Sequence, residues 1–179
     1  MTGPHPLAFR DAHHVGVCVP DLDAARRWLV AVLGAVPVAD WGPFADPDGD
    51  TVHALLDVDP RASVRGAFLR VGPTTNVELV EVAGTDGRDR FGGPQDVGTA
   101  HLAVFVDDLD TVLVRLRDDQ RVAWVGRPAG MPDGHPLAGY RFAFARAPWG
   151  LLLELVSYPD AAEPRFTAAG MYTPPPATP

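Results

Sequence analysis

Two histidines and two glutamates occur at matching places in a repeated sequence pattern. The segment His14–Asp23 returns later as His101–Asp110, with six of the ten positions identical. Each copy is followed by a short apolar run that contains a single acid, Glu78 in the first case and Glu154 in the second. Imidazole and carboxylate groups are common ligands of divalent metal ions. The repeat therefore predicts one four-ligand site, built from one His and one Glu of each copy.

The alternation of side chains along a strand predicts which faces carry these residues. In the first copy His14 and Gly16 share one face, and in the second His101 and Ala103 do the same. The opposite faces are aliphatic, and we expect helices to cover them. The small residues beside each histidine leave room for a ligand. Both glutamates are flanked by aliphatic residues, where a carboxylate is costly to bury unless it is paired or bound to metal.

The elements that position these residues follow the same order in both halves, β-α-β-β-β. In the first half a helix from about Ala24 to Leu33 is expected after a cap at Asp21 or Asp23, and Gly34 ends it. The other expected elements of this half are strands at 13–19, 52–57, 67–71 and 77–82, an extended segment at 35–39 and a Gly/Pro/Asp-rich loop at 42–50. In the second half we expect strands at 99–106, 121–125, 140–146 and 151–158, a helix at 109–118 and a loop at 126–139.

This order divides the chain into two modules with flanking segments. The predicted parts are an N-terminal extension (1–10), a first module (11–82), a linker (83–98), a second module (99–158) and a Pro-rich C-terminal arm (159–179). The arm contains Pro174-Pro175-Pro176 and is expected to lack regular structure.

Composition excludes several classes of function. The formal net charge is −8 and the arginines are scattered, which argues against nucleic acid binding. The chain contains no lysine, so Schiff-base chemistry, a lysine base and a P-loop are excluded. No apolar run is long enough to span a membrane, and no secretory signal is visible. Cys18 is the single cysteine, so no intramolecular disulfide can form, and we expect a cytoplasmic protein.

These motifs, taken in order, resemble the vicinal oxygen chelate superfamily, which includes glyoxalases, bleomycin-resistance proteins and dioxygenases. The resemblance covers about residues 11–158 and includes Ala147-Pro148-Trp149-Gly150 before the second glutamate, where Ala147 stands in place of the family's usual Asp. It implies an α+β fold of two paired βαβββ modules that form a cupped mixed sheet around a metal site. Carried over residue by residue, the metal ligands are His14, Glu78, His101 and Glu154. His13 is a neighbouring alternative, but the repeat and strand parity favour His14.

The resemblance also implies the chemistry. Family members chelate a substrate through adjacent oxygens, and one divalent ion (Zn, Ni, Co or Mn, in preference to Fe) stabilises a developing enediolate. With both carboxylate positions filled, we expect an epimerase, an isomerase or a glyoxalase-type lyase that acts on a small α-hydroxyketone such as a cyclitol. Glu78 and Glu154 would serve as ligands and as bases. An extradiol-type Fe(II) dioxygenase and a metal-free drug-resistance binding protein are the alternatives.

The surroundings of the site and the assembly are predicted less directly. Loops 40–51 and 126–141 are expected to line the mouth, contributing Trp41, Phe44, His53, Met131, His135, Tyr140 and Arg141. Among these, His135 and Tyr140 are candidate acid/base groups, although an ordinary surface role fits them equally well. The partner is a small-molecule substrate. The two exposed module edges indicate a homodimer. The resemblance implies the same, because most members of the family are homodimers.

Overall fold

The computed structural model describes residues 12–88, 91–135, 137–158, 165–166 and 172–173. The chain divides into two compact units, Met1–Asp89 and Arg90–Pro179, and each is described by itself. The predicted N-terminal extension lies outside the described residues. Within the described part of the chain, no helix is long and apolar enough to cross a membrane.

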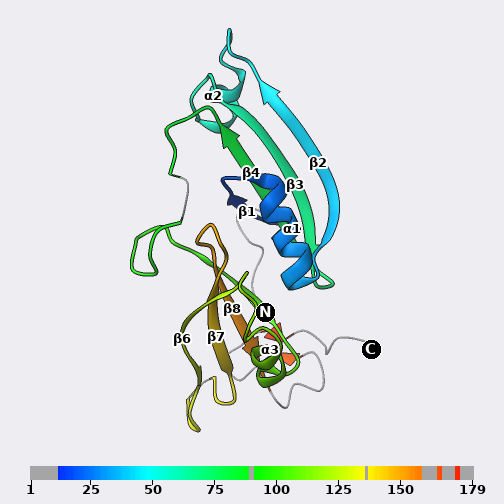
Figure 1. The fold of residues 1–179 in the computed structure, drawn as a ribbon, viewed down its shortest axis with the longest axis vertical. Helices are drawn as coiled ribbons and strands as arrows, with labels where there is room; N and C mark the ends of the chain where they lie inside the picture. Colours follow the sequence, from blue (N-terminus) through cyan, green and yellow to red (C-terminus); the bar gives the residue numbers. More distant parts are fainter. Residues whose placement is uncertain (1–11, 89–90, 136, 159–164, 167–171, 174–179) are drawn as a thin grey trace, which may run out of the picture. The chain divides into compact units, whose positions relative to one another are not determined.

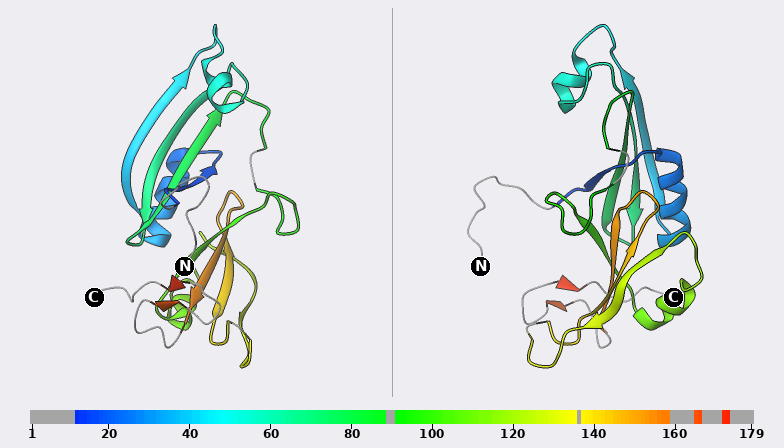
Figure 2. Two further views of the ribbon diagram at one scale, coloured as in Figure 1. Left: turned by 180° about the vertical axis from the view of Figure 1, so that it is seen from behind. Right: turned by 60° about the vertical axis from the view of Figure 1, so that its left-hand side comes forward.

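The first unit is a four-stranded mixed sheet, and Figure 1 shows it with its helices. Its elements are β1 (Val15–Cys18), α1 (Leu22–Leu33), β2 (Val36–Ala45), α2 (Thr51–Leu56), β3 (Ser63–Val71) and β4 (Thr75–Ala83). The strands lie in the order β1-β4-β3-β2, with β1 parallel to β4 and the other pairs antiparallel. Figure 2 shows β2 and β3 curving together along most of the unit's length.

Helix α1 covers one face of this sheet, and its sequence explains its limits. The side chain of Asp21 accepts a hydrogen bond from the Ala24 N–H at 2.8 Å, so Asp21 is the N-cap. Gly34 ends the helix with φ of 65°, a left-handed conformation that favours glycine. The buried residues recur at helical spacing and form the core-facing stripe; they are Leu22, Ala25, Trp28 and Leu29.

The second unit repeats this arrangement on a smaller scale. Its elements are β5 (His101–Phe105), α3 (Leu109–Arg115), β6 (Ala123–Gly130), β7 (Arg141–Arg146) and β8 (Leu152–Ser157). The strand order is β5-β8-β7-β6, again with the first pair parallel and the others antiparallel. Leu109 of α3 packs against Ala143 and Leu155 of the sheet. The predicted α+β class is confirmed, and each unit has a four-stranded sheet with a helix after the first strand; the second sheet follows the βαβββ order, while the first has α2 in addition between β2 and β3.

Three local predictions are wrong. Residues 52–57, predicted as a strand, belong to α2 (Thr51–Leu56), because a short apolar run does not by itself distinguish a helix from a strand. The predicted loop at 42–50 is strand as far as Ala45. Its Gly42-Pro43 pair falls where the pairing register shifts, and β2 is an edge strand, which tolerates proline. The loop predicted at 126–139 is also strand at its start. Strand β6 continues to Gly130, past a register shift between Val125 and Ala129.

The C-terminal arm was expected to lack regular structure, and this is wrong in part. Residues Arg165–Phe166 (β9) and Tyr172–Thr173 (β10) form an antiparallel two-stranded pair. Proline is absent from both short strands, so the ladder hydrogen bonds can form there. The rest of the arm, including Pro174-Pro175-Pro176, lies outside the described residues.

Candidate active site

The first unit brings His14 and Glu78 together. Because β1 runs parallel to β4 with Gly16 opposite Glu78, the His14 side chain two residues earlier points to the same face as the carboxylate. The His14 Nε2 atom lies 3.2 Å from Oε2 of Glu78. Gly16 carries no side chain beside this carboxylate, as expected for a position that leaves room. The His14 side chain is 34% exposed and that of Glu78 18%, so the pair opens to solvent on the histidine side.

The second unit builds the same pair in the same register. Ala103 of β5 lies opposite Glu154 of β8, and His101 again precedes it by two residues. The His101 Nε2 atom lies 3.1 Å from Oε2 of Glu154. The Ala147–Gly150 turn leads into β8, and Gly150 adopts φ of 101°, where other residues are strained. Both members of each predicted pair are therefore in contact within their own unit.

His13 lies next to the first pair but does not replace His14 in it. Its Nδ1 atom is 2.8 Å from Nδ1 of His14, so one of these two nitrogens donates to the other. When His14 donates, its Nε2 lone pair is free to bind an ion, the second-shell arrangement common for metal-bound histidine. The position that corresponds to His13 in the second copy is Ala100, so this support is present in one unit only.

Each glutamate also accepts a hydrogen bond from an aromatic side chain through its other oxygen. The Trp41 Nε1–H donates to Oε1 of Glu78 at 3.0 Å, and the Tyr140 hydroxyl donates to Oε1 of Glu154 at 2.9 Å. Burial and this hydrogen bond raise the pKa of Tyr140 above its ordinary value of 10, so the hydroxyl stays protonated near neutrality. Tyr140, a predicted acid/base group, thus contacts a predicted ligand.

A phenylalanine stands edge-on to each histidine, and the sequence analysis missed both. The rings of His14 and Phe68 lie 5.3 Å apart at 83°, and those of His101 and Phe144 lie 5.7 Å apart at 84°. Each phenylalanine is the strand partner of the glutamate, Phe68 of Glu78 and Phe144 of Glu154. Both precede that glutamate by ten residues, a repeated spacing that would have identified them.

The donor atoms of each pair fit a metal ion. Two ligands bound at about 2.0–2.1 Å with an angle of about 90–109° have donor atoms about 2.8–3.4 Å apart, and the two observed separations fall in this range. The donor set of imidazole nitrogen and carboxylate oxygen suits zinc and its neighbours. Among the described residues, however, no group of three or more His, Cys, Asp or Glu is arranged so that it could hold a metal ion. Each unit by itself brings together two of the four predicted ligands.

Three other predicted site residues, His135, Arg141 and His53, have hydrogen-bond partners other than the site glutamates. His135 is exposed in the segment between β6 and β7, where its Nδ1 accepts from the Leu137 N–H at 3.0 Å, and the described contacts do not link it to Glu154. Arg141, predicted at the mouth, forms a two-point ion pair with Asp110 of α3 at 2.8 and 2.9 Å. Its guanidinium group is therefore on the helix-covered face. His53 is on α2, with its Nδ1 3.0 Å from the Val58 carbonyl oxygen.

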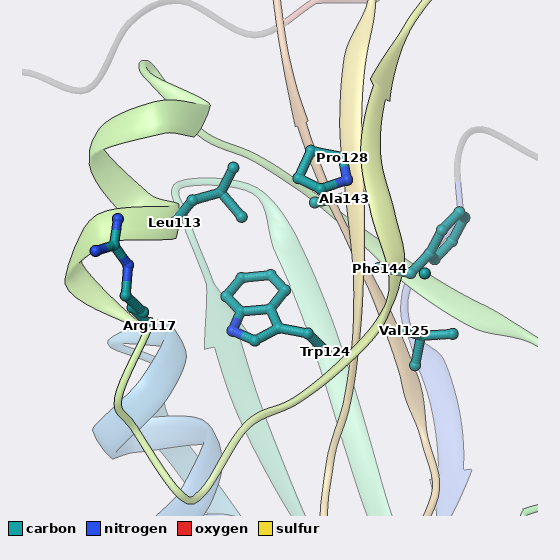
Figure 3. A pocket seen from close by; sticks show the side chains of 8 residues that line it. Leu113, Arg117, Trp124, Val125, Pro128, Ala143 and Phe144 are labelled. Atoms are coloured by element: carbon teal, nitrogen blue, oxygen red, sulfur yellow. The ribbon is translucent and has the colours of Figure 1, made fainter.

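A pocket of about 190 Å³ lies elsewhere in the second unit, between α3 and β6. Figure 3 shows Leu113, Arg117 and Trp124 on one side of the strands and the Phe144 ring on the other. Phe144 contacts His101 on that second side. The pocket therefore belongs to the helix-covered face, and we do not assign the chemistry to it.

Comparison with known proteins agrees with this geometry. Residues 13–144 match the Glyoxalase/Bleomycin resistance protein/Dioxygenase superfamily. The chain therefore belongs to this superfamily, as the sequence motifs predicted.

Among curated relatives, the chain is 40% identical over 162 residues to a 2-epi-5-epi-valiolone epimerase from Actinomyces sp., and the match covers 90% of this chain and 87% of the relative. Solved structures share the fold at lower identity. A glyoxalase family protein from Bacillus cereus matches with a TM-score of 0.62 at 19% identity, covering 82% of this chain and 92% of the other. The trypanothione-dependent glyoxalase I of Leishmania major matches with a TM-score of 0.56 at 21% identity, covering 84% and 88%.

Proposed function

We propose that this protein is an epimerase that acts on 2-epi-5-epi-valiolone or on a closely similar cyclic polyhydroxy ketone. The observation that carries the proposal is the 40% identity, over 90% of the chain, to an enzyme of that name. This substrate falls within the class that the duplicated carboxylates favour, the α-hydroxyketones. Inverting a carbon next to a carbonyl requires removal of a proton and its return to the other face, which two carboxylates can perform.

In this proposal the glutamates carry out the proton transfers to and from the substrate. One of Glu78 and Glu154 accepts the carbon-bound proton on its Oε2 atom, and the electron pair of the broken bond passes to the carbonyl oxygen. The electron pair then returns from that oxygen to the carbon, which takes a proton on its opposite face from the other carboxyl group in its protonated form or, when Glu78 is the base, from the Tyr140 hydroxyl beside Glu154. The first carboxyl group gives its proton to solvent. The aromatic donors Trp41 and Tyr140 support this proposal by holding the second carboxylate oxygens.

We further propose that His14, Glu78, His101 and Glu154 together hold one divalent ion, and that the glutamate acting as the base would release the ion while it carries the proton. When bound, the ion stabilises the negative charge that develops on the substrate oxygens. The separation of the donor atoms in each pair supports this. Two ligands bind an ion weakly, whereas four such ligands are typical of a protein zinc site.

The reaction is tested by incubating the purified protein with 2-epi-5-epi-valiolone in deuterated water and following the products by NMR. We expect a new epimer with deuterium at the carbon next to the carbonyl. His53→Ala is a suitable control variant, since His53 is exposed on α2. Conversion without deuterium and with uptake of oxygen would replace the epimerase with a dioxygenase. If the compound binds and does not change, a panel of other α-hydroxyketones, cyclitols and hemithioacetals identifies a different substrate.

We propose that the protein is a homodimer. The edge strand β2 exposes three large apolar side chains, and unpaired strand edges are common sites of association; these residues are Val36, Val38 and Phe44. Light scattering after size-exclusion chromatography should give twice the 19.1 kDa mass of one chain. A mass of one chain would reject the dimer.

A further inference from the structure

Trp41 is held from three directions in the first unit. Its Nε1–H donates to Oε1 of Glu78 at 3.0 Å. The ring of Phe44 stacks on the indole, with centroids 5.8 Å apart and 19° between the planes. Gly66 lies opposite Trp41 in the ladder between β2 and β3, and a Cβ atom added at Gly66 would clash with the indole ring. The indole therefore occupies space that any other residue at position 66 would fill.

We propose that Trp41 is a positioning residue that fixes the carboxylate of Glu78. Gly66 is required for this role, because its lack of a side chain leaves the space that the indole occupies. This inference rests on the proposed function, since it assigns a role within the same site. With Oε1 held by the indole, Oε2 is the oxygen that faces His14, 3.2 Å from its Nε2 atom. An indole N–H only donates, so it holds the oxygen without competing for the proton that Glu78 would move.

A purely structural role for Trp41 makes different predictions. The indole also packs against the buried cluster formed by Val52, Ala62 and Val64. If packing were its whole contribution, Trp41→Phe would lower stability and leave the orientation of Glu78 unchanged. Two substitutions separate the roles. Trp41→Phe keeps an aromatic ring and removes the donor, whereas Gly66→Ala keeps the donor and displaces it.

The hydrogen bond can be observed without substrate or metal. The chain has four tryptophans, so a ¹⁵N-labelled sample gives four indole N–H signals. Trp41→Phe identifies the Trp41 signal by its loss, and if that variant does not fold, the signal that Gly66→Ala displaces identifies it. Glu78→Gln should move this signal, because the acceptor loses its charge. Glu154→Gln is the matched control and should leave it in place.

Turnover and ion binding then test the positioning role. Trp41→Phe and Gly66→Ala should each lower kcat roughly tenfold, the scale of a lost hydrogen bond to a charged group, with little change in KM. Both should also weaken zinc binding measured by calorimetry. Trp124→Phe is the control for the tryptophan-to-phenylalanine change, because Trp124 is on the helix-covered face of the second unit. It should keep wild-type kcat.

The outcomes separate this inference from the proposed function. A Trp41 signal that does not move in Glu78→Gln, or a Trp41→Phe variant with the kcat of Trp124→Phe, overturns the positioning role. If the wild-type protein binds no zinc, the proposed ion is wrong, and the indole signal still decides the role of Trp41. If the wild-type protein does not convert 2-epi-5-epi-valiolone, the proposed substrate is wrong. The response of the indole signal to Glu78→Gln still decides whether Trp41 positions the carboxylate.

Discussion

In the first module the second oxygen of the site glutamate accepts from an indole, and in the second module it accepts from a phenol. The ladders show how this difference arises. Two residues before Phe68, β3 has Gly66 with Trp41 opposite. Two residues before Phe144, β7 has Phe142 with Ala129 opposite. Large and small residues have changed places across the strand pair: the aromatic residue of the pair belongs to β2 in the first unit and to β7 in the second.

The opposite faces of the sheets differ in a similar way. Arg65 of β3 bonds to Asp23 of α1 at 3.2 Å, and Arg141 of β7 bonds to Asp110 of α3. The strand partner of Arg65 is Glu81, which completes a charged network, whereas the partner of Arg141 is the buried Ser157. The histidine, glutamate and phenylalanine are therefore common to both units, while the hydrogen-bond partners around them have diverged. The shared part is the one that binds an ion in the proposed function.

The largest effect is expected from the glutamates themselves. Glu78→Gln and Glu154→Gln should each lower kcat by about 10²–10⁴-fold, because each removes a group that transfers a proton. Binding of substrate should weaken far less, since the lost interaction belongs to the transition state. Steady-state kinetics and the rate of deuterium incorporation measure both. If one variant keeps wild-type turnover, a single carboxylate carries the chemistry and the two units have separate roles.

The histidines should have matching effects on ion binding. His14→Ala and His101→Ala should each raise the Kd for zinc by more than the 10–100-fold typical of losing an outer-shell partner. His13→Ala should have a smaller effect, because His13 contacts His14 through Nδ1 and not the carboxylate. Isothermal titration calorimetry compares the three variants. Equal losses in His13→Ala and His14→Ala would show that the choice between these neighbours is wrong.

Removing the phenol tests the second unit alone. Tyr140→Phe should lower kcat by roughly tenfold, since Oε1 of Glu154 loses its charge-assisted hydrogen bond. His135→Ala should have little effect, because His135 is exposed and bonded locally to Leu137. A large loss in His135→Ala with none in Tyr140→Phe would reverse the roles of these two predicted acid/base residues.

The charged network around Glu81 should give the smallest effect, one of stability. The Arg65 guanidinium and the Leu22 N–H lower the pKa of Glu81 below its ordinary value of 4.5, while Asp21 opposes them and Asp23 shares Arg65. A lowered pKa adds stability above about pH 4.5 that is lost as the pH falls through the folded-state value. Glu81→Gln should therefore cost about 1 kcal/mol at pH 7 and less at pH 3. Urea unfolding at both pH values measures this, and a constant difference would contradict it.

The sequence predicted the two histidine–glutamate contacts because the repeat records the four residues directly. One imidazole and one carboxylate per copy, with strand parity, were enough to place His14 with Glu78 and His101 with Glu154. The surroundings were harder, because contacts across a ladder depend on register. Trp41 was assigned to a loop, since Gly42-Pro43 follows it, and the register shift that keeps it in β2 is not visible in composition.

The proposed function requires the two histidine–glutamate pairs to hold one ion together. The direct measurement is the zinc stoichiometry of the purified wild-type protein and of the paired variants His14→Ala/Glu78→Gln and His101→Ala/Glu154→Gln, determined by calorimetry. A shared site predicts one ion per chain in the wild type and no tight binding in either paired variant. Two ions per wild-type chain, with one retained after either pair is removed, would show two separate sites and contradict the account.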